Sequence, residues 1–369
     1  MSGKVQTKIC YILPVYDSDT GSHFFHLYEF LELAAKEFDV FVVIEKCKCQ
    51  PAWPFGFYCQ KFSFPPLRML ELLAVLTRER LAGRRYFYTH YSFYGTIAAW
   101  LVTRIFGGQA YYWNSGMPWN YRRPWFEEKV FRFILRHTIL VTNPPGLAVE
   151  YRRRHGLRAD RIRIVPHYIS VQRFQAGPSR AEARARVDIP PEAKVILFVH
   201  RLSRRKGAHL IPEIAAEVTK CEKNAMFLVV GTGPEEESLK LEVKSLKLEP
   251  HVRLVGEVPQ RDIVPYFRAA DVFLLPSEEE GFPHVLLEAM AAGVPYIASD
   301  VGGVREMTPP SLQRFIVTPG DANSFTEKII EFLNIAPSAR KIIIKEMEEW
   351  IKRYDTSAVL SQFVKLFRA

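Results

Sequence analysis

The feature that most constrains the fold is an alternation between short, continuously apolar runs and longer segments that carry apolar residues at helical spacing. The apolar runs lie at 8–14, 39–45, 86–90, 109–114, 138–142, 161–166, 194–200, 225–231, 251–256, 271–276, 294–299 and 314–318. Continuously apolar strands joined by helices indicate parallel sheets that are buried on both faces. We therefore predict an α/β chain built from doubly wound parallel sheets.

The chain divides into two domains in this interpretation. Its 369 residues exceed one ordinary core and suit two domains of about 150 to 200 residues each. The segment "QAGPSRAEARARVDIPPEA" at 175–193 separates two sets of strands, which predicts domains at 1–174 and 194–350 with a linker between them. Since ligands bind at the carboxyl ends of strands in open α/β sheets, two facing domains would enclose a cleft.

Cysteine usage and hydropathy predict the cellular compartment of the protein. No apolar run approaches the roughly 18 to 20 residues of a membrane span, and the first residues lack a signal-peptide pattern. The five cysteines form an odd, scattered set, which favours reduced thiols in a cytoplasmic protein. Cys47 and Cys49 form a C-x-C pair without a second pair of ligands, so a zinc site is the minor alternative.

The net charge of +10 is concentrated in the first half of the chain. Residues 1–174 hold 24 Lys and Arg against 13 Asp and Glu, whereas residues 175–369 hold 26 against 27. Basic residues interleaved with aromatic ones suit an anionic membrane surface, a lipid phosphate or nucleic acid. A solvated basic face without a partner is the alternative. The segment 67–88 is likewise either a membrane-surface helix or a core helix that ends at Gly83.

Several loops that follow strands of the second half carry candidate binding residues. Arg201 and Lys206 lie in "RLSRRKG", where two cations beside a helix start would hold a phosphate or diphosphate. Taken alone, this is equally a basic surface loop. Gly231 and Gly233 form a Gly-x-Gly turn, but Glu236 occupies the place of the third glycine of a dinucleotide fingerprint. A dinucleotide-dependent oxidoreductase is therefore disfavoured.

The stretch "PSEEEGFPHVLLEAMAAGVPYIASDVGGVREM" resembles the signature of the GT-B retaining glycosyltransferases of family 4, also described as glycosyl transferases group 1. The family motif E-x7-E falls on Glu280 and Glu288. The other matching motifs are R-L-x(n)-K-G at 201–207, G-x-G-P at 231–234 and V-x-x-x-G at 252–256. This ordered series spans roughly 195–320, and residues 8–174 match more loosely.

The resemblance implies a site for a nucleotide sugar in the second domain. Glu288 would bind the ribose hydroxyls and Glu280 the donor sugar, while Arg201 and Lys206 would neutralise the diphosphate as it departs. The other implied donor-binding residues are Gly21, Gly231, Val258, Gly281, Phe282 and His284. The alternative for Glu288 is a first-turn acid that complements the helix dipole.

The resemblance also assigns residues of the first domain. His90 would lie near the anomeric carbon, so the implied catalytic residues are His90, Glu280, Arg201 and Lys206, although a histidine at a strand end is often structural. Asn114, Arg122 and Arg123 are the candidate acceptor-binding residues. No Asp-x-Asp metal site is implied, and we expect neither a metal nor a cofactor beyond the nucleotide sugar. The chain departs from the family pattern at Ser22, His167, His200 and His284, which leaves donor and acceptor choice open.

The function expected from this resemblance is transfer of a hexose from a nucleotide sugar, with retention, to a lipid-linked or saccharide acceptor at the cytoplasmic membrane face. The last helix, within 351–369, would cross back to the first domain. An anionic membrane surface is an expected partner and nucleic acid is not. Two alternatives remain: a GT-B enzyme acting on a soluble acceptor or using inorganic phosphate, and a non-catalytic binder of membrane or nucleic acid.

Overall fold

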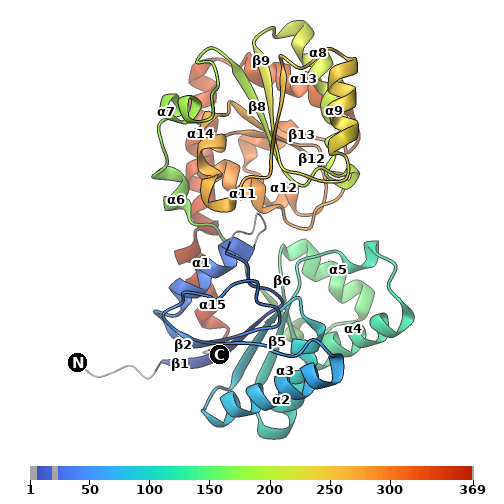
Figure 1. Cartoon of the computed structure of the whole chain (residues 1–369), viewed down its shortest axis with the longest axis vertical. Coiled ribbons are helices and arrows are strands. Elements are labelled where there is room, and N and C mark those ends of the chain that lie inside the picture. Colours follow the sequence, from blue (N-terminus) through green and yellow to red (C-terminus); the bar gives the residue numbers. More distant parts are fainter. Residues whose placement is uncertain (1–5, 19–23, 368–369) are drawn as a thin grey trace, which may run out of the picture. The chain divides into compact units, whose positions relative to one another are not determined.

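The computed structural model describes residues 6–18 and 24–367. The chain forms two compact units, Met1–His167 with Ser357–Ala369 and Tyr168–Thr356 (Figure 1). Each unit contains one parallel sheet with helices, and the two sheets confirm the predicted α/β class with doubly wound architecture.

The first unit is built on a seven-stranded parallel sheet with the order β3-β2-β1-β4-β5-β6-β7. Its strands are β1 (Thr7–Leu13), β2 (Phe38–Ile44), β3 (Gly56–Cys59), β4 (Tyr86–His90), β5 (Gln109–Trp113), β6 (Ile139–Thr142) and β7 (Ile162–Ile164). Its helices are α1 (Phe24–Ala34), α2 (Pro65–Leu81), α3 (Phe93–Phe106), η1 (Pro118–Asn120), α4 (Trp125–His137), α5 (Pro145–His155), η2 (Ala159–Arg161) and α15 (Thr356–Lys365).

Alternating side chains of the first sheet pack against two different helix layers. On one face Tyr88 contacts Phe363 of α15 at 5.1 Å between ring centroids, and Phe30 of α1 contacts the same ring at 5.1 Å. On the other face Phe87 is buried with Leu72 and Leu76 of α2. Helix α2 is therefore the core helix that one of the two sequence interpretations predicted.

The second unit is built on a six-stranded parallel sheet with the order β10-β9-β8-β11-β12-β13. Its strands are β8 (Lys194–Val199), β9 (Ala225–Val230), β10 (Val252–Gly256), β11 (Val272–Leu275), β12 (Tyr296–Ser299) and β13 (Ile316–Val317). Its α-helices are α6 (Val171–Gln175), α7 (Arg180–Arg186), α8 (Ile211–Cys221), α9 (Glu236–Ser245), α10 (Val264–Ala269), α11 (His284–Ala291), α12 (Val304–Met307), α13 (Ala322–Leu333) and α14 (Pro337–Ile351). Its 3-10 helices are η3 (Arg204–Lys206), η4 (Ala208–Leu210), η5 (Gln260–Asp262), η6 (Pro310–Phe315) and η7 (Lys352–Tyr354).

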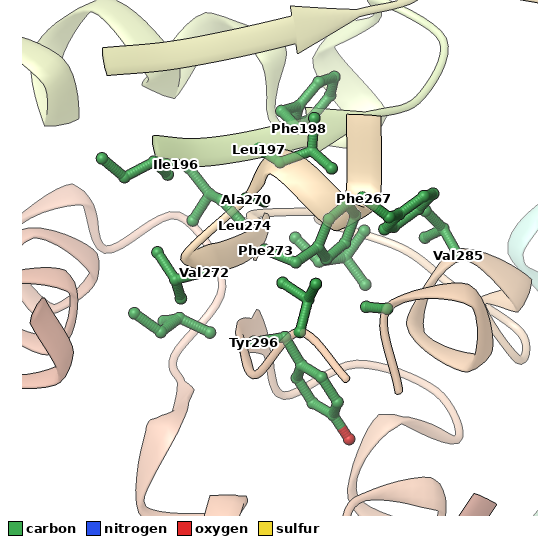
Figure 2. Close-up of a cluster of buried hydrophobic side chains, with 14 of the residues drawn as sticks. Ile196, Leu197, Phe198, Phe267, Ala270, Val272, Phe273, Leu274, Val285 and Tyr296 are labelled. Atoms are coloured by element: carbon green, nitrogen blue, oxygen red, sulfur yellow. The ribbon is translucent and has the colours of Figure 1, made fainter. Parts of the chain in front are cut away.

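The core of the second unit joins the central strands to the helix that carries Glu288. Figure 2 shows Phe273 of β11 beside Phe267 of α10, with Val285 of α11 in the same cluster. The rings of Phe267 and Phe273 stack at 5.6 Å between centroids. Phe267 and Phe273 are fully buried and Val285 is 8% exposed, so the start of α11 belongs to the same apolar core as β11.

Every strand predicted from the sequence is present, and β3 is an additional one. β3 lies at the sheet edge, is only partly buried and contains a glycine, so it lacks the continuous apolar pattern of a buried strand. Among the described helices, none combines the length and the apolarity needed to cross a membrane.

The segment 175–193 is an integral part of the second unit rather than the predicted linker. It contains α7, which begins with a capping box between Ser179 and Glu182. Arg184 of α7 donates to the buried carboxylate of Asp271 at 2.8 Å. The chain passes between the units at residues 167–168, not 174, and returns to the first unit at residue 357.

The cysteines differ from the expectation of reduced thiols. Cys47 and Cys59 form a disulfide, whereas Cys10, Cys49 and Cys221 are free. The parallel pairing of β2 with β3 brings the chain around Cys59 close to the residues that follow β2. Since Cys47 is bonded to Cys59, the pair Cys47 and Cys49 is not the zinc site considered as an alternative.

Candidate active site

The second sheet changes strand order between β8 and β11. From β8 the chain continues through β9 and β10 on one side, and β11 then starts the other side with β12 and β13. Ligands of open α/β sheets bind at the carboxyl ends of the strands at such a switch point. Lys206 lies in the loop after β8 and Glu280 lies in the loop after β11, so the topology brings these two predicted residues together.

A buried cluster of polar side chains forms at this point. The Lys206 ammonium lies 2.7 Å from Oε1 of Glu280, and the Ser277 hydroxyl donates to the same oxygen at 2.8 Å. Nε2 of His200 lies 3.3 Å from it. Lys206 and Glu280 are both buried. A charged pair removed from water in this way is costly unless its hydrogen bonds are satisfied, which is typical of a functional site.

The environment sets the charge of each member of this cluster. Burial alone would raise the pKa of Glu280, but the hydrogen bond from His200 and the charge of Lys206 outweigh it and lower the pKa to about 2. Burial lowers the pKa of Lys206, against the opposing effect of Glu280. Burial likewise lowers the pKa of His200, although Glu280 opposes this shift. At neutral pH Glu280 is therefore a carboxylate beside the neutral imidazole of His200.

Two glycines allow the loops of neighbouring strands to touch backbone to backbone. A Cβ added to Gly207 would lie 2.0 Å from the carbonyl oxygen of Pro276, and one added to Gly302 would lie 2.0 Å from that of Glu280. Both glycines have positive φ. The amide of Gly303 donates to the carbonyl of Gly281 at 2.8 Å. Side chains at these two positions would push the Glu280 loop out of place.

Glu288 is buried in α11, and its carboxylate accepts a hydrogen bond from the amide of Gln260. Helix α11 begins at His284, with Pro283 as its N-cap rather than its first residue. Glu288 therefore lies beyond the first turn, and the alternative of a first-turn acid acting on the helix dipole is wrong. A carboxylate on a buried helix that accepts from a side-chain amide is also suited to accept hydroxyl protons from a ligand.

The other predicted donor residues of the second unit lie in the loops that follow its strands β8 to β11. Arg201 is exposed, and its backbone amide donates to Nδ1 of His200 at 2.9 Å. Gly231 follows β9 directly, and its amide donates to the carbonyl of Gly256 at 2.7 Å. Val258 and Gly281 are partly exposed, whereas Phe282 is buried against Tyr354. Gly21 lies outside the described residues.

The first sheet has its own switch point between β1 and β4, and His90 lies there. His90 ends β4 and is buried. Its Nδ1 lies 3.2 Å from the hydroxyl of Tyr11 in β1, and its ring stacks on Trp113 at 5.6 Å between centroids. The predicted histidine therefore lies at the switch point of the first sheet, in a tightly packed aromatic setting.

The three candidate acceptor residues lie in the segment between β5 and α4. Asn114 donates to the hydroxyl of Tyr112 at 2.9 Å and accepts from the amide of Gly116 at 2.9 Å, so its side chain stabilises the turn after β5. Arg123 lies over the ring of Phe131 at 4.4 Å. Arg122 is exposed.

Sequence reasoning did not assign a role to His200, Ser277 or Gln260. Ser277 stands three residues before Glu280, which is a weak local signal for a residue that shares its loop. Gln260 follows β10 and contacts α11, a pairing that no local pattern reveals. His200 was visible only as a departure from the family pattern.

Solved structures identify the fold of this protein. HepE of Anabaena, solved in complex with UDP, matches with a TM-score of 0.81 at 17% identity over 98% of this chain and 100% of that one. Sucrose-phosphate synthase of Thermosynechococcus elongatus matches with a TM-score of 0.78 at 22% identity over 98% of each chain. At these identities the likeness establishes the fold, which is the GT-B fold of glycosyltransferases.

Sequence comparison finds a match over the second half of the chain. Residues 179–350 match the family described as "Glycosyl transferases group 1". D-inositol 3-phosphate glycosyltransferase of Kineococcus radiotolerans is 34% identical over 175 residues, which are 45% of this chain and 40% of that protein. Phosphatidyl-myo-inositol mannosyltransferase of Mycobacterium leprae is 29% identical over 247 residues, 66% of this chain and 60% of that protein. The matched stretches thus cover less than two thirds of these relatives.

Proposed function

We propose that this protein is a hexosyltransferase that moves a sugar from a nucleoside-diphosphate sugar to an acceptor with retention of configuration. The observation that carries the proposal is the buried pair of Lys206 and Glu280 at the switch point of the second sheet. Glu288 adds a second buried carboxylate in the neighbouring helix α11. The HepE structures with UDP and with UDP-glucose support a nucleotide sugar as the donor.

Each residue has a role in this proposal. Lys206 and the exposed Arg201 attract the diphosphate and stabilise the negative charge that grows as the glycosidic bond breaks. Glu288 accepts the two ribose hydroxyls, and Glu280 accepts a hydroxyl of the sugar. With two cations at the diphosphate, we propose that transfer needs no metal. A titration with EDTA and with added Mg²⁺ would test this independence.

Retention requires the acceptor to attack on the face that the leaving group vacates. Enzymes that retain configuration by double displacement place a carboxylate nucleophile beside the anomeric carbon. We propose front-face attack assisted by the departing phosphate because the motifs that match the family assign no nucleophile.

The first unit offers a surface that suits a lipid-linked acceptor. It holds 25 Lys and Arg against 13 Asp and Glu, a net charge of +12, whereas the second unit holds 25 against 27. Trp125 and Phe126 at the start of α4 are 71% and 53% exposed, and Lys129 lies 4.5 Å from the centroid of the Trp125 ring. Exposed aromatic rings beside cations suit the interface of an anionic membrane. We propose a lipid-linked acceptor at the cytoplasmic membrane face.

The first test of the donor site is thermal unfolding with a panel of nucleotide sugars. A ligand present at 100 times its dissociation constant should stabilise the wild type by about 2.7 kcal/mol. Glu288→Ala and Lys206→Ala should lose this stabilisation, because each removes a group that binds the donor. Hydrolysis of the stabilising nucleotide sugar, or transfer of its sugar to an acceptor, would then identify the donor. A protein that binds anionic lipid or nucleic acid but no nucleotide sugar would contradict the proposal and favour a non-catalytic binder.

The membrane surface is tested with vesicles of phosphatidylglycerol and phosphatidylcholine at low and high salt. The double variant Trp125→Ser, Phe126→Ser should bind vesicles about 10- to 100-fold more weakly, since each ring loses apolar burial at the interface. Leu241→Ser, Ile342→Ser is the matched control, because both side chains are 69% exposed and belong to the second unit. Equal vesicle binding by wild type and double variant, or full activity without lipid, would favour a soluble acceptor.

A further inference from the structure

His200 is fixed at the junction between the loops that follow β8 and β9. Its backbone amide donates to the carbonyl of Val230 at 3.1 Å. Its own carbonyl lies so close to Gly231 that a Cβ added there would be 2.0 Å away. The main chain of His200 therefore has little freedom, and the direction of its side chain is set by the sheet.

The hydrogen bonds of the imidazole select one tautomer. The backbone amide of Arg201 donates to Nδ1 at 2.9 Å, so Nδ1 is the acceptor nitrogen. The proton of the neutral ring must then reside on Nε2, which lies 3.3 Å from Oε1 of Glu280. Burial lowers the pKa of His200, and the neutral ring keeps this single donor at neutral pH.

The donors that hold Glu280 all converge on one of its two oxygens. Lys206, Ser277 and His200 contact Oε1, and within the described residues no donor is recorded at Oε2. A carboxylate fixed through one oxygen presents the other to a ligand in a defined direction. Lys206 differs from the other two donors because its charge also attracts a diphosphate. The diphosphate therefore competes with Glu280 for the Lys206 ammonium.

We propose that His200 is a positioning residue that keeps Glu280 aimed at the donor sugar once Lys206 turns to the diphosphate. This inference rests on the proposed function. With a donor bound, the two neutral donors Ser277 and His200 hold Oε1, and Oε2 accepts a hydroxyl of the sugar. The contribution of His200 therefore concerns the sugar part of the donor rather than its nucleotide part.

Two matched substitutions test the inference. In His200→Gln the side-chain amide nitrogen reaches the place of Nε2 and still donates to Glu280, whereas in His200→Asn the amide reaches only the place of Nδ1. We expect His200→Asn to lose about 10- to 100-fold in affinity for the nucleotide sugar, the range for a hydrogen bond to a charged group. We expect His200→Gln to lose less than about threefold in affinity for the nucleotide sugar, because it keeps the hydrogen bond to Glu280 with only a change in geometry.

The affinity for the nucleoside diphosphate alone distinguishes a positioning role of His200 from general damage to the site. The affinity of both variants for the matching nucleoside diphosphate should stay within about threefold of the wild type, because His200 does not serve the diphosphate. Equal losses in the two variants, or an equal loss for the diphosphate and the sugar nucleotide, would overturn the role of His200 and leave the proposed function intact. A wild type that binds the diphosphate but no nucleotide sugar would overturn both.

Discussion

Replacing Lys206 by methionine should lower kcat for sugar transfer by about 100- to 1,000-fold, the range for removing one group that stabilises developing negative charge. Lys206 is buried and is the cation held at the switch point by Glu280. In the proposed reaction its charge meets the diphosphate as the bond to the sugar breaks. Methionine keeps most of the side-chain volume and removes the charge. Initial rates at saturating donor and acceptor measure the effect.

Stability must be measured beside the rate, because the same substitution breaks a buried ion pair. The loss of one partner of such a pair costs about 3 to 5 kcal/mol. Ser277 and His200 still donate to Glu280 and offset part of this cost. Arg204→Met is the control, since Arg204 is an exposed cation in the same turn, η3. If Lys206→Met stayed folded and retained wild-type kcat, Lys206 would have no role in the departure of the diphosphate.

The resemblance to a family predicted Lys206 and Glu280 as residues of one candidate site, and they meet because parallel strands place their carboxyl ends at one edge of a sheet. Lys206 and Glu280 are 74 residues apart, yet each follows a strand that is recognisable from its apolar run. β8 and β11 are neighbours in the sheet, so the two loops meet. The positions of both residues were therefore predictable from the order of motifs along the chain.

The partners of these residues were not predictable, since they depend on directions of side chains that no periodicity encodes. His200 is distinguishable in the sequence only as a departure from a family pattern, and its contact with Glu280 depends on the tautomer that the amide of Arg201 selects. Asn114 stands after a strand like many binding residues, but its amide group serves Tyr112 and Gly116.

Segments with weak patterns misled the sequence interpretation in two places. The residues at 175–193 are rich in charge, proline and alanine, which is typical of a linker, but Arg180 and Arg184 pair with the buried Asp271 and tie the segment to the second unit. The strand β3 is a partly exposed edge strand, so its pairing with β2, and with it the disulfide of Cys59, had no signal in the apolar pattern.

The substitution Gly207→Ala should destabilise the second unit by more than about 4 kcal/mol and abolish sugar transfer. Gly207 has a φ of +72°, and a Cβ there would lie 2.0 Å from the carbonyl oxygen of Pro276. Gly320→Ala is the matched control, because Gly320 has a φ of +78° with nothing within 4 Å of the added Cβ. The control should cost only the roughly 1 to 2 kcal/mol of a left-handed alanine and leave transfer intact.

The difference between the two glycine variants isolates the contact between the loops after β8 and β11. Alanine at 207 can be accommodated only if Pro276 moves away, and Ser277 and Glu280 follow it in the same loop. Chemical denaturation followed by tryptophan fluorescence and circular dichroism, together with initial rates of transfer, measures both effects. Equal stability and equal rates in Gly207→Ala and Gly320→Ala would show that the two loops need not touch. The position of Glu280 would then depend on its side-chain partners rather than on the close packing of the backbone.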